Sequence, residues 1–286
     1  MNYLLLSSIK HENKIQEDIK LKNELSINHK CDIIAWENVD QSVISNYDVF
    51  IIRSVWGYHL NHEKFNTLIK KINDSKKAII NSYDNVRNNI SKLYQYEFCT
   101  KNNLKIIPSY FITSPQIDIA QIKSTLNITN DSIIVIKPII SASGDGTQKI
   151  KLSELNINEY NELFLKDNGI VIQPYIESIN NGEYSAIIID NKLEYVVTRF
   201  PGVLSSEKKV ELLPKIPQNL LSSIQKCISA IKKLNTCYYR LDFFEVLGDY
   251  YINEIEMVDP DLFTRKIDKE IANQTTKKFA NAIIKI

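Results

Sequence analysis

The sequence predicts an α/β protein that begins with a parallel-sheet domain and ends with antiparallel strands. In the first 88 residues, short apolar runs alternate with polar, helix-like stretches, which is typical of parallel strands joined by helices. Further along, strand-like runs flank short turns at Asp190-Asn191 and around Gly248, which predicts two hairpins. The 286 residues are 44% hydrophobic and 24% charged, a composition and length that fit a packed chain with more than one core. We expect three parts, at 1–88, 89–175 and 176–286.

In the N-terminal part, one apolar run indicates where a ligand would bind. The run at 47–54 is apolar until Arg53, as in a strand buried on both faces. Ligands of parallel sheets collect beyond the carboxyl ends of the strands, so we expect Arg53, Trp56 and Tyr58 to line a substrate pocket. The alternative is that the two rings pack within the loop and Arg53 pairs locally. The expected strands lie at 3–8, 31–36, 47–54 and 78–81, and the helices at 11–25 and 63–72.

The rest of the chain reads as helices mixed with antiparallel strands. The turn at Asp190-Asn191 joins strands at 184–190 and 193–200, and a last pair of strands is expected at 237–246 and 250–258. The other expected strands lie at 105–111, 132–140, 149–152 and 169–176, and the helices at 89–102, 158–167, 218–234 and from 266 onward.

Charge and cysteine usage exclude several classes of protein. Lys and Arg number 35 against 34 Asp and Glu, and a net charge of +1 argues against a broad surface for nucleic acid or anionic lipid. The apolar run after Met1 is too short for an export signal, and no run approaches the length of a membrane helix. The four cysteines form no CxxC pair, so we expect free thiols in a reducing cytoplasm.

The last expected hairpin carries a group of acidic residues. Side chains alternate along a strand, so a turn centred on Gly248 places Asp242 opposite Glu254 and Arg240 opposite Glu256. A slip of one residue would separate these groups onto opposite faces. Carboxylates facing one another destabilise a strand pair unless a cation joins them, and an all-oxygen set suits Mg²⁺ or Mn²⁺. The alternative is a solvated sheet face with Arg240 as the partner of the carboxylates.

Two further stretches fit a nucleotide. The strand carrying Lys137 leads into the loop 141–147, which is rich in Ser, Gly and Thr, and the backbone amides and hydroxyls of such a loop can hold phosphates. It lacks the Walker A pattern, and Asp145 is expected at its tip or pointing away. Taken alone, it could equally be a hairpin turn. In the stretch 171–176 an apolar strand ends at Pro174, and the backbone beyond Pro174 could bind the edge of an adenine.

In their order along the chain, these pieces resemble the ATP-grasp superfamily. The resemblance covers nearly the whole sequence, and the N-terminal part is similar to the branch that contains D-cycloserine synthetase and glutathione-synthetase-like ligases. The pieces are Lys92, Lys137-Pro138, the loop 141–147, the segment 173–176, Glu183, Arg240 to Asp242, and Asn253 to Glu256. Those shared with the branch are Trp36, the stretch 53–58, Phe65, Asn81 and the stretch 259–263.

The resemblance implies a fold and a set of residue roles. The fold would be an N-terminal parallel-sheet domain, a small lid, and a C-terminal antiparallel catalytic domain. Arg199 and Arg240 would be catalytic, contacting the transferred phosphate, and Asp242, Glu254 and Glu256 would hold two Mg²⁺ ions, with Glu256 standing where many members have Asn. The ATP-binding residues would be Lys92, Lys137, Ser141, Ser143, Gly144, Gly146, Thr147, Gln173, Tyr175, Ile176 and Glu183, and the substrate residues Arg53, Trp56, Tyr58 and Gly202.

The resemblance also implies a reaction. ATP would phosphorylate a carboxylate, and an amine would then attack the acyl phosphate, so the chain would be a cytoplasmic ligase acting on small amino-acid-like or peptide substrates. A homodimer is expected from the same resemblance. Three alternatives stay open: ring closure within one substrate, phosphoryl transfer as the endpoint, and a nucleotide-binding protein without catalysis.

Overall fold

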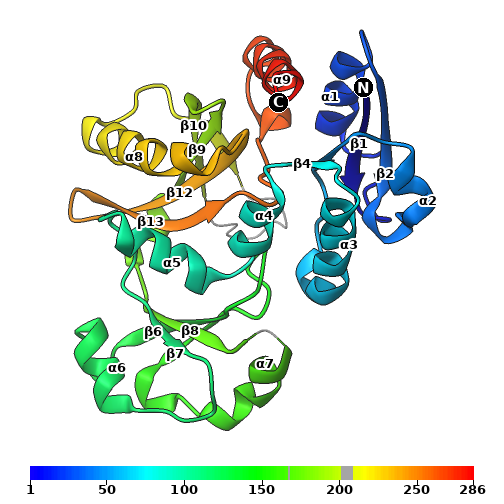
Figure 1. The fold of residues 1–286 in the computed structure, drawn as a ribbon. Coiled ribbons are helices and arrows are strands. Elements are labelled where there is room, and N and C mark those ends of the chain that lie inside the picture. The colour runs from blue at the N-terminus through cyan, green and yellow to red at the C-terminus, as the bar shows by residue number, and fades with distance from the viewer. Residues whose placement is uncertain (167, 201–208) are drawn as a thin grey trace.

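The structure is a computed structural model, in which residues 1–166, 168–200 and 209–286 are described. Three separate sheets organise the chain, and Figure 1 shows one in each of three regions. Their strand orders are β2-β1-β3-β4, β5-β8-β6-β7 and β11-β10-β9-β12-β13. The expected α/β class, with an N-terminal parallel sheet and a C-terminal antiparallel sheet, is therefore confirmed.

The first sheet is parallel throughout. Its strands are β1 (Asn2–Ser7), β2 (Lys30–Ala35), β3 (Val49–Ile52) and β4 (Ala78–Ile80), and its helices are α1 (Gln16–Leu25), α2 (Gln41–Ser45) and α3 (His62–Asp74). All four residues of β3 are buried, as expected for a strand covered on both faces. Helix α1 begins later than the predicted residue 11, because the carbonyl of Ser8 accepts hydrogen bonds from the amides of His11 and Glu12 and bends the chain into turns.

The second sheet forms a lobe of its own, seen at the bottom of Figure 1. Its antiparallel strands are β5 (Tyr110–Ile112), β6 (Ile133–Pro138), β7 (Gln148–Lys151) and β8 (Ile170–Pro174), packed against α6 (Ile119–Leu126) and α7 (Asn161–Lys166). The strand predicted at 105–111 is wrong over its first five residues. There the chain pairs instead with the third sheet, where the Ile107 amide donates to the Ile252 carbonyl at 3.0 Å. The expected end of the helix at residue 167 lies outside the described residues.

The third sheet is antiparallel and carries the C-terminal half. Its strands are β9 (Glu183–Ile189), β10 (Lys192–Arg199), β11 (Val210–Leu212), β12 (Tyr238–Val246) and β13 (Asp249–Glu256), followed by α9 (Lys269–Ile284). Asp190 and Asn191 have φ values of 50° and 56°, which is the conformation of a tight hairpin turn. Helix α8 (Gln218–Ile231) covers one face of the sheet through Leu220 and Ile224.

Two helices join the first sheet to the third. The helix predicted at 89–102 begins only at α5 (Lys92–Lys101), because Ser91 caps it, and α4 (Tyr83–Asn89) precedes it. Asn81, just after β4, fixes this junction with four hydrogen bonds. Its amide nitrogen donates to the carbonyls of Tyr238 and Met257, and its oxygen accepts from the amides of Cys237 and Tyr238.

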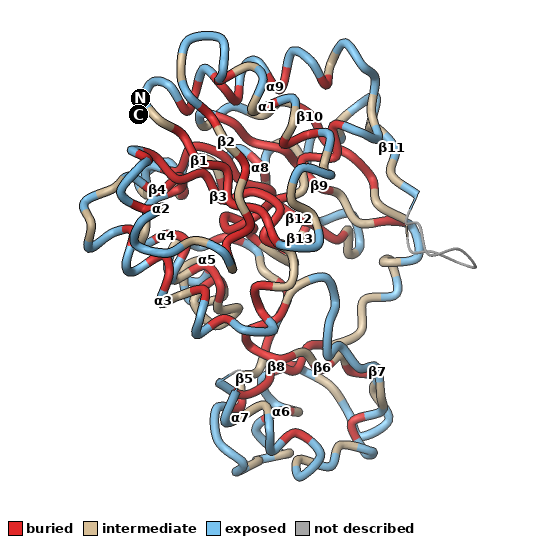
Figure 2. The backbone as a smooth tube through the Cα atoms, turned by 90° about the vertical axis from the view of Figure 1, so that its right-hand side faces the viewer, coloured by how far each residue is buried: buried red, intermediate tan, exposed pale blue. Residues whose placement is uncertain are grey.

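The core is shared between the two ends of the chain. One cluster contains Leu5 and Ile51 of the first sheet, Ile187 of the third, and Phe279 of α9. Figure 2 shows buried backbone concentrated in β1, β3 and β12, whereas the β5–β8 lobe has a smaller buried centre of its own. We propose borders at residues 88 and 175, with the outer two parts acting as one body.

Short 3-10 turns complete the described chain, at Trp36–Asn38, Tyr58–Asn61, Leu152–Glu154, Ile157–Tyr160, Glu177–Asn181, Lys232–Leu234 and Thr264–Lys266. Among the described helices, none has both the length and the apolar character required to cross a membrane.

Candidate active site

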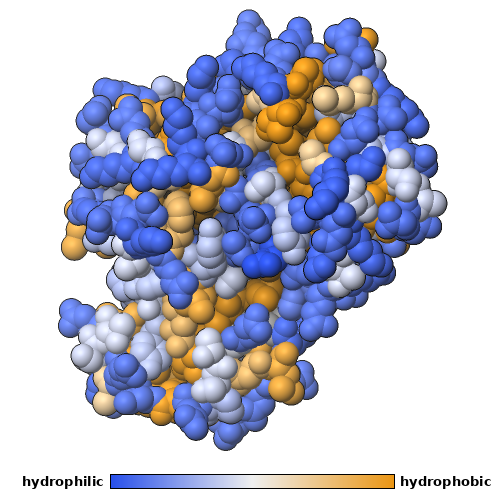
Figure 3. All heavy atoms as spheres, in the orientation of Figure 1, coloured by the Kyte–Doolittle hydropathy of each residue, from blue (hydrophilic) through white to orange (hydrophobic). Residues whose placement is uncertain are grey.

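One cavity, of about 670 Å³, is lined by residues from all three sheet regions. In Figure 3 the outer face is mostly hydrophilic, and apolar side chains gather where the lower lobe meets the rest of the molecule. Most of the predicted site residues line this cavity: Trp56, Tyr58, Lys92, Lys137, Ser141, Ser143, Gly144, Thr147, Gln173, Tyr175, Ile176, Glu183, Arg199, Arg240, Glu254 and Glu256. Most of the residues that the sequence suggested for the site therefore lie around one cavity in the structure.

Strands β12 and β13 pair in the predicted register at the site, and this register depends on a β-bulge. Asp242 pairs with Glu254 and Arg240 with Glu256. The turn itself has only two residues, Leu247 and Gly248, since Val246 already pairs with Asp249. Continued without a break, this register would put Asp242 opposite Asn253. A bulge between Asp242 and Phe243 adds one residue to β13 and restores the carboxylate pair.

Asp242 is enclosed by cations of the protein. Its oxygens accept from Arg240 Nε at 2.9 Å and from Ser185 Oγ at 2.6 Å, and Arg199 Nη2 lies 2.8 Å away. The side chain is 0% exposed. Burial opposes its ionisation, but the two arginines outweigh burial and hold the pKa of Asp242 below its ordinary value. Asp242 is therefore a carboxylate whose charge is already balanced.

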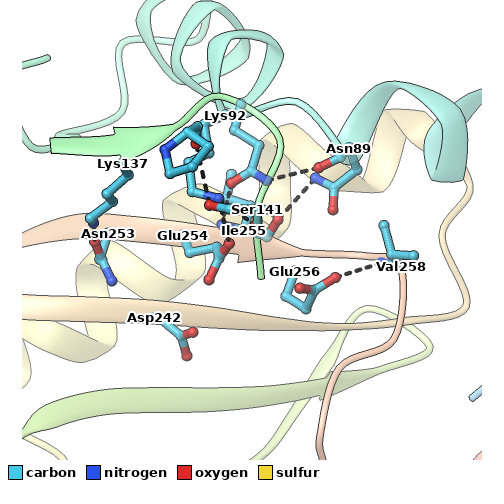
Figure 4. A network of polar contacts seen from close by, with 12 residues as sticks. Asn89, Lys92, Lys137, Ser141, Asp242, Asn253, Glu254, Ile255, Glu256 and Val258 are labelled. Atoms are coloured by element: carbon cyan, nitrogen blue, oxygen red, sulfur yellow. Dashed lines mark hydrogen bonds and ion pairs between the residues drawn. The ribbon is translucent and has the colours of Figure 1, made fainter. Parts of the chain in front are cut away.

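The two glutamates of β13 face the cavity with less compensation. Glu254 lies 4.0 Å from Lys92 Nζ, and Glu256 accepts hydrogen bonds from the backbone amides of Val258 and Asp259. Burial and the nearby Glu254 raise the pKa of Glu256 to about 7. Figure 4 shows both side chains on β13 above Asp242. Among the described residues, no three His, Cys, Asp or Glu side chains converge closely enough to hold a metal ion by themselves.

The two predicted lysines lie on the opposite wall. Lys92 Nζ donates to the Ser141 carbonyl at 2.6 Å, and Lys137 Nζ donates to Asn253 Oδ1 at 3.3 Å. Burial and the positive charge of Lys92 lower the pKa of Lys137. Both ammonium groups point toward the acidic strand in Figure 4, so positive charge faces negative charge across this part of the cavity.

Asn253 is a site residue that the sequence reasoning did not assign a role. Its amide nitrogen donates to Glu183 Oε1 at 2.6 Å while its oxygen accepts from Lys137. Simple alternation would place Asn253 and Glu254 on opposite faces, but the bulge turns both toward the cavity. The only signal in the sequence is the position of Asn253 directly before Glu254.

The glycine loop after β6 turns tightly, as predicted. Gly144 and Gly146 have φ values of 79° and 66°, and a Cβ at Gly146 would lie 2.7 Å from the Pro138 ring. Gly146 is therefore needed for a close approach, and it lies outside the set of cavity-lining residues. Asp145 is largely exposed at the tip, where its carboxylate pairs with His59 Nε2 at 3.4 Å. The loop thus contacts the N-terminal domain.

The segment predicted to bind adenine lines the cavity with its backbone partly occupied. The Tyr175 amide donates to the Ile133 carbonyl at 3.0 Å, and the Ile176 carbonyl accepts from the Ile179 amide. Gln173 Nε2 donates to Ser109 Oγ, which fixes its side chain. The Tyr175 amide and the Ile176 carbonyl are therefore already used within the protein.

Arg53 lies away from the cavity, in contrast to the sequence-based expectation. It is buried against Asp18, with Nε 3.1 Å from Oδ1, and Nη1 donates to the Pro260 carbonyl. Its guanidinium also lies 5.5 Å from the rings of Tyr238 and Phe279. As in the alternative, Arg53 pairs within the N-terminal domain, although Asp18 lies 35 residues away in sequence. Its bond to Pro260 joins this domain to the C-terminal part. Gly202, the other substrate candidate, lies outside the described residues.

The fold and the site together define an ATP-grasp protein. The chain belongs to the family described as prokaryotic glutathione synthetase, ATP-grasp domain, whose model matches residues 91–261. No curated protein sequence matches it.

Solved structures with the same fold are distant in sequence. D-cycloserine synthetase DcsG shares 16% identity at a TM-score of 0.82, covering 99% of both chains. D-alanine–D-alanine ligase from Bacillus anthracis, complexed with ATP, shares 15% sequence identity at a TM-score of 0.73, and the match covers 100% of this chain and 96% of the ligase chain. The ATP-grasp ligase PsnB, complexed with a minimal precursor, shares 13% sequence identity at a TM-score of 0.66, and the match covers 99% of this chain and 100% of the PsnB chain.

Proposed function

We propose that the protein is an ATP- and Mg²⁺-dependent carboxylate–amine ligase that works through an acyl phosphate on small amino-acid-like or peptide substrates. The observation that carries the proposal is one cavity in which two lysines face a carboxylate-bearing strand, with two arginines beside it. Family membership supports the use of ATP. The reaction class fits the ligases among the solved structures with this fold.

The part of the cavity near the two lysines and the glycine loop offers hydrogen-bond donors and positive charge that suit a triphosphate. Lys92 and Lys137 provide ammonium groups, and Ser141, Ser143 and Thr147 provide hydroxyls and backbone amides. A phosphate beside Lys137 would favour its protonated form, which burial now disfavours. The adenine would lie toward Gln173 and Ile176, and Glu183 would accept from the ribose.

The metal end fits Mg²⁺ held jointly by protein and nucleotide. Glu254, Glu256 and Asp242 offer only oxygen ligands, and Mg²⁺ usually keeps several ligands from water and phosphate. The described carboxylates do not form a complete cage, which agrees with an ion that needs phosphate oxygens to complete its shell. When bound, the ions would neutralise the transferred phosphoryl group.

The arginines would act on the charge that develops in the reaction. Arg199 and Arg240 hold Asp242 and line the cavity beside the glutamates. Their position is fixed before substrate binds, so they can stabilise phosphoryl oxygens without reorganising. The loop 141–147 and His59 would close over the reacting groups and keep water from the acyl phosphate.

The proposal is tested by phosphate release from Mg-ATP with amino acids and short peptides, singly and in pairs, with mass spectrometry of the products. A pair that stimulates release and yields a product lighter than their sum by one water supports ligation. Loss of water from a single compound indicates ring closure, and a stable phosphorylated product indicates phosphoryl transfer. Stimulation by no carboxylate at all would contradict the ligase. The reducing cytoplasm is the proposed location, in keeping with four buried free thiols.

A further inference from the structure

A buried carboxyl group with one unpartnered oxygen lines the cavity. Asp259 lines the cavity and is 8% exposed. Its Oδ2 is buried, and the described part of the chain offers it no hydrogen-bond partner. Leaving a buried carboxyl oxygen without a donor costs free energy, so such an atom beside a cavity points to a ligand that donates to it.

The neighbouring acids, in contrast, already have partners. Asp261 receives two hydrogen bonds from Arg265, at 2.8 and 2.7 Å. Asp242 is paired with Arg240 and Arg199. One oxygen of Glu256 accepts two backbone amides. The nearby arginines therefore bond to other carboxylates, and burial together with the charge of Glu256 raises the pKa of Asp259 well above its ordinary value. A cation bound beside Asp259 would offset both effects and favour its ionised form.

The surroundings of Asp259 suit a small cation. Tyr58 comes from the N-terminal domain, lines the same cavity and is only 3% exposed. Phe263 lines the same cavity, with the guanidinium groups of Arg240 and Arg199 5.6 and 5.7 Å from its ring. A positively charged group held between an aromatic wall and a carboxylate is stabilised by both.

We propose that Asp259 binds the ammonium group of the carboxylate-donating substrate, which makes that substrate an amino acid rather than a simple carboxylic acid. The inference rests on the proposed ligase function and deepens it by naming the substrate class. Asp259 is three residues beyond Glu256, on the segment that leaves the acidic strand. A substrate whose carboxylate reaches the proposed metal end of the cavity, beside Glu256, would therefore hold its ammonium group toward Asp259.

The attacking amine is a different group from this ammonium. An amine must be neutral to attack the acyl phosphate, whereas an amine held against a carboxylate is kept protonated. Asp259 therefore positions the donor substrate, and the second substrate enters separately.

The experiment compares each amino acid with its deamino counterpart, in which hydrogen replaces the amino group. Phosphate release is measured with Mg-ATP for the wild-type protein, for Asp259→Asn, for Asp259→Glu, and for the control Asp131→Asn at an exposed position of the lower lobe. Binding of the same compounds is measured by calorimetry with Mg²⁺ and a non-hydrolysable ATP analogue, which requires no turnover. Thermal melting establishes that each variant is folded.

The proposal predicts that an amino acid stimulates the wild-type protein and that its deamino counterpart does so at least tenfold more weakly. Asp259→Asn should raise the KM for the amino acid at least tenfold and leave the KM for ATP and the Mg²⁺ dependence unchanged. Asp259→Glu should recover part of the loss, and Asp131→Asn should match wild type.

Equal stimulation by both members of a pair would overturn the ammonium site while leaving the ligase intact. A shift in Mg²⁺ dependence in Asp259→Asn would assign the residue to the metal instead. If an amino acid binds through Asp259 but no phosphate is released, the ammonium site stands and the proposed reaction fails. If no free amino acid binds at all, the ammonium site is wrong.

Discussion

Asp242 and Glu254 face each other across one rung of the β12–β13 ladder, but only Glu254 lines the cavity. Asp242 is withdrawn beneath Arg199 and Arg240, which balance its charge. The two carboxylates therefore differ in their partners: Asp242 already bonds to the two arginines, whereas Glu254 faces the cavity. This difference separates the effects expected from substituting them.

Substitution of Glu254 by Gln should abolish Mg²⁺-dependent turnover. The amide keeps the size but loses the charge, and metal stabilisation of a phosphoryl group is worth several kcal/mol, so we expect a loss of at least about 100-fold. The measurement is phosphate release against Mg²⁺ concentration. Glu245→Gln on the same hairpin, outside the cavity, serves as the control. An unchanged rate in Glu254→Gln would remove this residue from the metal site.

Mg²⁺ binding should weaken as the pH falls through neutrality. The pKa of Glu256 is raised to about 7 by burial and by Glu254, so a proton must leave before a metal binds below that pH. We expect apparent Mg²⁺ affinity, measured with an ATP analogue present, to drop between pH 7.5 and about 6. Glu256→Gln should bind Mg²⁺ more weakly at high pH and flatten this dependence. Equal slopes in both proteins would contradict the assignment.

Glu256 should also make the free energy of unfolding of the ligand-free protein depend on pH. Because the folded state disfavours ionised Glu256, the unfolded chain loses this proton first, near its ordinary pKa of 4.5. The contribution of Glu256 to the free energy of unfolding is therefore full below that pH and decreases up to about pH 7. Urea unfolding of wild type and Glu256→Gln across this window isolates the contribution, and a wild-type contribution that rises with pH would have the wrong sign.

Arg53→Ala should destabilise the fold rather than change a substrate KM. Removing one member of a buried ion pair leaves the Asp18 carboxylate without compensation, which typically costs about 3–5 kcal/mol. Urea unfolding measures the loss, and Arg53→Met with Asp18→Asn should be more stable than Arg53→Ala alone. A stable Arg53→Ala protein with a raised substrate KM would restore the original expectation that Arg53 binds substrate.

The contact between His59 and Asp145 should favour closure of the glycine loop. The carboxylate is more than half exposed, so the pair is expected to contribute only modestly. Asp145→Asn should raise the KM for ATP about two- to fivefold, which corresponds to less than about 1 kcal/mol. A double-mutant cycle with His59→Gln checks it: additive effects would show that the two side chains act independently.

The order of strands and helices was largely predictable because it follows from local patterns. The apolar run of β3 and the turn at Asp190-Asn191 are visible in the sequence itself. The segment at 105–109 was not predictable. Its apolar residues satisfy a strand pattern, yet Leu104 and Ile106 pack into the core of the third sheet. The pattern of apolar residues indicates that a segment is buried. Which sheet the segment packs against is determined by the tertiary fold.

The site was predictable where chemistry depends on residue type, and less so where it depends on backbone irregularity. Lys92, Lys137 and Glu254 came from the expected series and line one cavity. Asn253 depends on a bulge, and a bulge has no fixed sequence signature. Arg53 illustrates the opposite error, because its partner Asp18 lies 35 residues away in sequence and could not be paired with it in advance.

The most direct test of the central claim follows a carboxylate oxygen through the reaction. The carboxylate donor identified in the phosphate-release panel is prepared with ¹⁸O in its carboxylate and incubated with Mg-ATP and the amine. The acyl-phosphate route predicts one ¹⁸O in each phosphate released, because the carboxylate oxygen leaves with the phosphoryl group. Phosphate without label would contradict carboxylate activation and with it the account of this site as the centre of a ligase.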